Sequence, residues 1–139
     1  MRLSDCAATV PVDCDSCSGP VAGEAYETIV DGRLHWVLTH DCPGGEVEAM
    51  GWDETPAELR QAILDQCGLY RLRLDREPGG GKVAVLKVLR GSGRTLSEAS
   101  GALADLLGPG IPGTEAELHL LATRLQRAGG TPSVRRDGR

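Results

Sequence analysis

The sequence predicts an α+β protein in which a small β-hairpin unit precedes a unit with the element order strand, helix, helix, strand, helix, strand. The first supporting observation is Asp31-Gly32, which separates two runs rich in strand-forming residues. The second is the alternation of arginine with apolar residues within positions 69–74. The third is a pair of Thr-x-x-Glu patterns that begin apolar, helix-periodic segments in the second half of the chain.

The hairpin is expected within residues 24–39. Residues 25–30 and 33–38 are rich in β-branched and aromatic side chains, and Asp-Gly joins them. A two-residue turn of this type needs positive φ at both positions, which Asp and Gly tolerate. Residues 43–55, by contrast, are polar and contain several glycines, so we expect an irregular connection there.

A helix is expected to follow, from Pro56 to about Cys67. Proline is favoured in the first turn of a helix, where its missing N–H would lack a partner in any case. Thr55 and Glu58 have the spacing of a capping box. Gly68 is the expected end of the helix, because glycine adopts the left-handed conformation that commonly follows a last turn.

Charge divides the chain close to this helix. Residues 1–67 hold thirteen acidic residues and three arginines, and residues 68–139 hold seven acidic and twelve basic residues. We therefore expect a hairpin unit at 1–50, a linking helix at 51–68 and a second unit at 69–136. The asymmetry predicts that the two parts attract each other or that each binds a different partner.

The second unit begins with the alternating strand at 69–74. Three helices are expected to follow, at 82–91, 95–107 and 114–128. Residues 108–113 contain two prolines and three glycines, so they predict a short extended segment that makes a poor strand. A short strand at 131–135 and a frayed tail complete the unit. The tail contains two adjacent cations, Arg135 and Arg136.

The first of these helices has two different faces on a helical wheel. Its core-facing arc holds three branched apolar residues: Val85, Val88 and Leu89. The opposite arc mixes two branched apolar residues with two cations: Val83, Leu86, Lys87 and Arg90. Either the helix is buried on all sides with its cations reaching water, or the second arc is a docking face, apolar at the centre and cationic at the rim.

The stretch Lys82 to Gly91 resembles the first helix of the C-terminal domain of the bacterial ribosomal large-subunit stalk protein. The resemblance extends over residues 69–136, in the order of the predicted elements and in Leu96-Ser97-Glu98. It implies three helices packed on a three-stranded sheet. It also implies a docking face for a translation factor or another ribosome-associated partner, formed by Lys82, Val83, Leu86, Lys87 and Arg90. The family's dimerisation region and hinge have no counterpart in residues 1–68, which suggests a divergent relative.

A possible metal motif flanks the hairpin. Cys14 and Cys17 form a Cys-x-x-Cys pair before it, and His40 and Cys42 follow it. Two tight turns at the base of a hairpin can hold four ligands around zinc, so the segment resembles a zinc ribbon. The second turn lacks the usual second cysteine, because Gly45 occupies its position.

Either His40 or Cys6 could be the fourth ligand. A ribbon that has lost its metal and packs around Trp36 is an equal alternative to a structural zinc site. Two free thiols are a further alternative. Five cysteines are an odd number, and no hydrophobic segment typical of a signal peptide is present, so we expect a cytoplasmic protein without disulfides. Cys67 is expected to pack at a helix end.

The sequence favours a protein-interaction module over an enzyme. Only Cys42 beside His40 or His35 could supply a nucleophile and base, while His119 suits a helix surface. The expected partner is another protein: a translation factor, a ribosome component, or a toxin if the chain is an immunity protein. An adaptor that delivers another protein is a related alternative. A zinc-ribbon regulator of nucleic acid fits less well, because the first half is acidic and no stacking platform is present. No membrane-spanning segment is expected.

Overall fold

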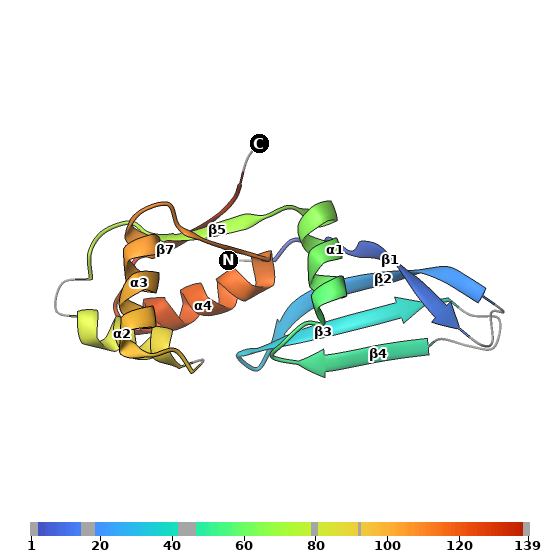
Figure 1. Ribbon diagram of the computed structural model, residues 1–139, viewed down its shortest axis with the longest axis horizontal. Coiled ribbons are helices and arrows are strands. Elements are labelled where there is room, and N and C mark those ends of the chain that lie inside the picture. Colours follow the sequence, from blue (N-terminus) through green and yellow to red (C-terminus); the bar gives the residue numbers. More distant parts are fainter. Residues whose placement is uncertain (1–2, 15–18, 42–46, 79–80, 92, 138–139) are drawn as a thin grey trace. The chain divides into compact units, whose positions relative to one another are not determined.

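The computed structural model describes residues 3–14, 19–41, 47–78, 81–91 and 93–137. The chain forms two compact units, Met1–Gly68 and Leu69–Arg139 (Figure 1). Both units are mixed α+β. Together they contain two antiparallel sheets and four helices among the described residues. No described helix is both long and apolar enough to span a membrane.

The first unit is a four-stranded antiparallel sheet with one helix. Its strands follow the chain order β1-β2-β3-β4 across the sheet. They are β1 (Ala8–Cys14), β2 (Gly19–Val30), β3 (Arg33–His40) and β4 (Val47–Trp52). Helix α1 (Ala57–Cys67) packs against β1 and β2, so the segment expected to link two units is part of the first one. Small and branched side chains form its core: Ala8, Val10, Ala25, Leu34, Val37 and Ile63.

The predicted hairpin is confirmed as β2 and β3. Val30 pairs with Arg33 across a two-residue turn, in which Asp31 has φ 50° and Gly32 has φ 74°. The predicted connection at 43–55 is wrong for residues 47–52, which form β4 and pair with β3. Strand β1 was also not expected. The first unit is therefore a larger sheet than a hairpin with two metal-binding turns.

The start of α1 differs from the prediction. Pro56 is the N-cap residue, and no side chain caps this helix. Thr55 is buried, and its hydroxyl donates a hydrogen bond to the Glu27 carboxylate on β2 instead of accepting one from the Glu58 backbone. The helix ends at Gly68, which has φ 103°. The expected capping box is absent because the sheet offers Thr55 a competing partner.

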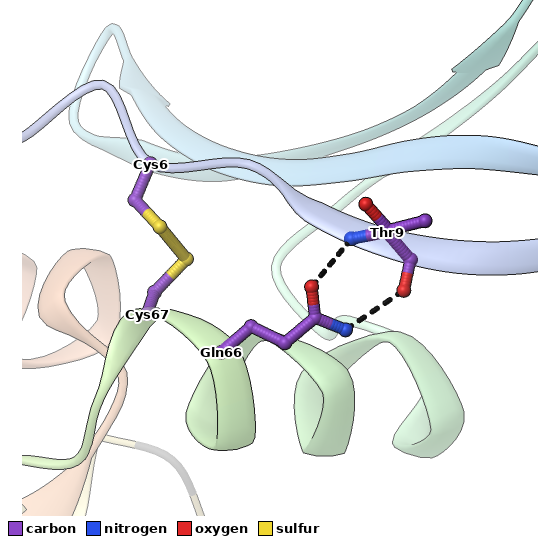
Figure 2. The surroundings of a disulfide bond; sticks show 4 residues. All are labelled: Cys6, Thr9, Gln66 and Cys67. Carbon is purple, nitrogen blue, oxygen red and sulfur yellow. Dashed lines mark hydrogen bonds between the residues drawn. A yellow bond between two sulfur atoms is a disulfide. The ribbon is translucent and has the colours of Figure 1, made fainter.

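A disulfide bond joins the start of the chain to the end of α1. Cys6 and Cys67 are bonded, with Cα atoms 5.9 Å apart (Figure 2). The neighbouring Gln66 side chain makes two hydrogen bonds to the backbone of Thr9: its Oε1 accepts from the Thr9 N–H at 2.7 Å, and its Nε2 donates to the Thr9 carbonyl at 2.8 Å. The expectation of a protein without disulfides is therefore wrong, and Cys67 is not a merely packed thiol.

The second unit has the predicted element order. Its strands are β5 (Tyr70–Leu74), β6 (Ile111–Gly113) and β7 (Pro132–Arg136), in the sheet order β6-β5-β7. Its helices are α2 (Lys82–Arg90), α3 (Leu96–Leu107) and α4 (Glu115–Arg127). The three helices lie on one side of the sheet (Figure 1). Their apolar sides and the even-numbered positions of β5 form the core: Leu72, Leu74, Val85, Leu89, Ala99, Ala102, Leu103, Leu106, Leu118 and Leu125.

Two predicted capping boxes are confirmed in this unit. At α3, the Thr95 hydroxyl accepts from the Glu98 N–H at 3.1 Å, and Glu98 accepts from the Thr95 N–H at 2.9 Å. Thr114 and Glu117 make the same pair of bonds at the start of α4. Each box satisfies two backbone donors that a helix leaves without partners, so it fixes the first residue of the helix.

Candidate functional site

Helix α2 presents a mixed apolar and cationic surface, which we call the α2 face: Lys82, Val83, Leu86, Lys87 and Arg90. On the other side of the helix, Val85 and Leu89 are fully buried in the core. Val83 has 78% of its surface exposed, the largest exposure of any large apolar side chain among the described residues. The three cations of this face are all exposed. The helix is therefore two-sided within the second unit.

Leu86 departs from the predicted arrangement. It is half-buried and packs against the core of the unit, as does Val88. Ala84 is exposed. The buried stripe is thus shifted toward Leu86, and Val83 becomes the apolar centre of the α2 face. A helical wheel places residues by angle alone and does not include the core residues against which Leu86 packs.

A cavity of about 400 Å³ adjoins the N-terminal end of the α2 face. Its lining combines the approach to α2 with one side of α3: Glu77, Pro78, Lys82, Ser100, Leu103, Ala104 and Leu107. Leu107 is partly exposed at this cavity, and Leu96 at the other end of α3 has 56% of its surface exposed. Exposed apolar side chains therefore also occur on α3, which the sequence prediction did not include.

The charges on α2 have one sign. Its charged residues are Lys82, Lys87 and Arg90, and it has no acidic residue in its first turn. The cations in the last turn also interact favourably with the partial negative charge at the helix C-terminus. A complementary surface would be apolar at its centre and acidic around it.

The candidate metal ligands are only partly described. Cys17 and Cys42 lie outside the described residues. Cys14 pairs with Gly19 at the end of β1, whereas His40 follows Thr39, the partner of Glu24. His40 is therefore level with Gly23 of β2, which is four residues from Gly19, or roughly 13 Å along the strand. This offset does not favour a shared ion for Cys14 and His40.

No group of three or more potential metal-ligating side chains occurs among the described residues. Cys6 is removed as the alternative fourth ligand because its sulfur is bonded to Cys67. His40 is buried, and its Nε2 atom has no hydrogen-bond partner within the described part of the chain. A structural zinc ion held by Cys14, Cys17, His40 and Cys42 remains a prediction.

The remaining histidines have structural surroundings. The His35 ring lies 4.4 Å from the Trp52 ring, between centroids, and Arg33 lies over the same indole. His119 was expected on a helix surface, but it is buried within α4. Its burial lowers the imidazole pKa, and the nearby Glu115 carboxylate partly offsets this shift. The only predicted nucleophile, Cys42, lies outside the described residues.

A second charged site was missed by the sequence prediction. The tail residues Arg135 and Arg136 were expected to be frayed, but they form the end of β7 and pair with β5. Together with Arg71 and Arg73 they line a cavity of about 380 Å³. The alternation of arginine and leucine in β5 was the available signal, because it placed two arginines on the side of the strand away from the core.

The chain matches no protein-family model, and the comparisons found no significant match to it among curated proteins or solved structures. The resemblance of residues 69–136 to the stalk family therefore rests on the sequence pattern. Any function assigned to either unit is a proposal argued from its own residues.

Proposed function

We propose that this protein is a non-enzymatic interaction module that binds a partner protein through the α2 face. The observation that carries the proposal is the exposure of Val83, 78% of its surface, between flanking lysines. An exposed branched side chain carries a free-energy cost of hydration that a docked partner removes. Cations around an apolar centre then restrict the partner to one with acidic residues at matching positions.

The partner class follows from the resemblance to the stalk family. We propose a translational GTPase or another ribosome-associated protein with an acidic docking surface. The exposed side chains of Leu96 and Leu107 on α3 support a footprint that spans two helices. An immunity or adaptor protein would use the same surface on a different partner.

A cytoplasmic location is part of this proposal. Cytoplasmic glutathione and thioredoxin keep most thiols reduced, so Cys6 and Cys67 would be thiols there for most of the time. The disulfide is the observation that weighs most against this location. Labelling of free thiols in protein taken directly from the native host would distinguish the two states.

The docking proposal is tested with Val83→Asp combined with Lys87→Glu. Val83 is chosen over Leu86 because Leu86 packs on the core, so a substitution of Leu86 would also disturb the fold. The matched control is Val30→Asp with Arg127→Glu, which introduces the same change of charge at exposed positions on β2 and α4, outside the α2 face. We expect the test variant to weaken binding to purified host translational GTPases at least about tenfold, as measured by calorimetry. The control should bind as the wild type does.

Two results would contradict the docking proposal. One is the absence of binding to these GTPases together with equal capture of all host proteins by the wild type and the test variant. The other is equal loss of binding in the test and control variants. Circular dichroism and thermal melting of each variant establish that the fold is retained.

A further inference from the structure

The side of the β5–β7 sheet away from the helices carries a row of arginines. Arg71 and Arg73 are at alternate positions of β5, and Arg71 pairs directly with Arg135 on β7. The intervening Leu72 and its partner Val134 pack toward the core on the other side. Like charges directly opposite each other on one face of a sheet are destabilising, so this pairing has a cost unless an anion lies between the guanidinium groups.

Two of these arginines are held in place by neighbouring groups. Arg73 donates from Nε to the Pro109 carbonyl at 3.2 Å. Its side chain lies over Gly110, where an added Cβ would be 3.0 Å from Arg73 Cγ, and Gly110 has φ 94°. Arg71 donates from Nε to the Asp137 carboxylate at 2.9 Å. Because each contact uses Nε, the two terminal nitrogens of each guanidinium group are left for another acceptor.

Arg135 is the arginine of the row whose positive charge is least balanced by neighbouring groups. Its side chain is exposed and makes no ion pair or hydrogen bond with the described residues. With Arg136, the cavity contains four arginines and two aspartates, so its net charge is +2. Arginine presents a planar set of donors that matches the oxygens of a phosphate group. The cavity volume of about 380 Å³ is sufficient for a small ligand.

The aspartates determine the shape of anion that fits. Asp137 donates its N–H to the Leu69 carbonyl at one end of the row, beside Arg71. Asp75 lies at the other end, where it accepts a hydrogen bond from the Ser133 hydroxyl at 3.1 Å. A polyanion extended along the strands would meet a carboxylate at both ends, whereas a compact dianion would lie among the arginines alone. The lining also has no aromatic side chain on which nucleic acid bases could stack.

We propose that this face binds a small phosphorylated molecule, with its phosphate monoester or diphosphate group between Arg71, Arg73 and Arg135. The site is independent of the proposed docking function, because the α2 face belongs to the helical layer and these arginines lie on the opposite side of the sheet. Small phosphorylated ligands are therefore the expected class, and the phosphate group is the part that the site recognises.

Titration of the full chain with inorganic phosphate and pyrophosphate, followed by NMR and calorimetry, tests this inference. We expect saturable binding at one site, with the largest shifts in β5 and β7. Arg135→Gln should weaken pyrophosphate binding at least about tenfold, the effect of losing a charged hydrogen bond. Asp75→Asn should strengthen it by removing a negative charge. Arg127→Gln, which removes one exposed arginine from α4, should leave it unchanged.

Several outcomes would overturn the inference. No saturable binding of either anion at low ionic strength would do so, as would an equal loss in Arg135→Gln and Arg127→Gln. Binding of a long duplex in the absence of pyrophosphate binding would assign the face to nucleic acid instead. Thermal melting of Arg135→Gln should match the wild type, because this exposed side chain makes no contact on which the fold depends.

Discussion

At the scale of single residues, His119 connects burial to pH. It lies on α4 with 9% of its surface exposed, and burial lowers its pKa while Glu115 acts in the opposite direction. The charged imidazole is therefore disfavoured in the folded state compared with the unfolded chain. Protonation of the unfolded chain begins near the ordinary pKa of 6.5, before the folded protein binds the same proton.

This difference predicts a loss of stability in mild acid. Above pH 6.5 the imidazole is mostly neutral in both states and contributes no pH dependence. As the pH falls below that value, the unfolded state gains protons first, so the free energy of unfolding decreases until the pH passes the folded pKa. Urea unfolding at several pH values should show this decrease in the wild type and a weaker one in His119→Gln. An NMR titration that places the His119 pKa above 6.5 would contradict it.

At the scale of elements, the three Thr-x-x-Glu patterns had different outcomes. Those at Thr95 and Thr114 form capping boxes, whereas Thr55 bonds to Glu27 on a strand that is distant in sequence. Local patterns therefore predicted α3 and α4 correctly, because the described part of the chain offers their threonine hydroxyls no partner outside the capping boxes. The same pattern failed at α1 because tertiary structure supplies a partner that local spacing does not encode.

The caps predict measurable stability losses. Thr114→Ala should lower the free energy of unfolding by about 1–2 kcal/mol, because Thr114 is fully buried and its loss leaves backbone donors of α4 unsatisfied. Thr95→Ala, at an exposed cap, should cost about 1 kcal/mol. Ser97→Ala, in the same turn of α3 but outside the box, serves as the control and should change stability by less than about 0.5 kcal/mol. Urea unfolding provides the values; equal losses in all three variants would contradict the role of the boxes.

Strands β1 and β4 show which elements local sequence could not predict. In β4, Gly51 pairs with Trp36, and a Cβ at this position would lie 2.6 Å from the indole Nε1. The glycine that suggested an irregular loop is therefore required by a side chain on the next strand. In β1, Pro11 discourages a strand prediction, but β1 is an edge strand, where proline is tolerated.

The candidate site, like the fold, was only partly predictable from the sequence. Helical periodicity identified the exposed positions of Val83, Lys87 and Arg90 on α2. It did not predict that Leu86 packs on the core, since this depends on neighbouring elements. The arginine row was also missed, because the pairing of Arg71 with Arg135 joins residues at opposite ends of the second unit. Most of the structural features that local patterns did not predict depend on contacts between residues far apart in the sequence.

At the scale of the whole molecule, the disulfide restrains only one of the two units. Cys6 and Cys67 both belong to the first unit and are 61 residues apart in sequence. A cross-link that closes a loop of this length stabilises a protein by about 4 kcal/mol in the chain-entropy model. The second unit contains no cysteine, so its stability does not depend directly on the redox state.

Reduction should therefore affect the two units unequally. In calorimetry with and without a reductant, we expect the unfolding transition of the first unit to move to lower temperature while that of the second unit stays in place. Cys6→Ser should reproduce this change in the absence of reductant. Mass spectrometry under both conditions monitors the bond itself. A shift of both transitions by the same amount would show that the units unfold together.

The distribution of aromatic residues offers an optical means of separating the units. Both tryptophans of the chain, Trp36 and Trp52, are in the sheet of the first unit, and the second unit contains Tyr70 but no tryptophan. Indole emission therefore monitors the first unit alone, without any label. A ligand or denaturant that changes the backbone signal but not the indole emission acts on the second unit.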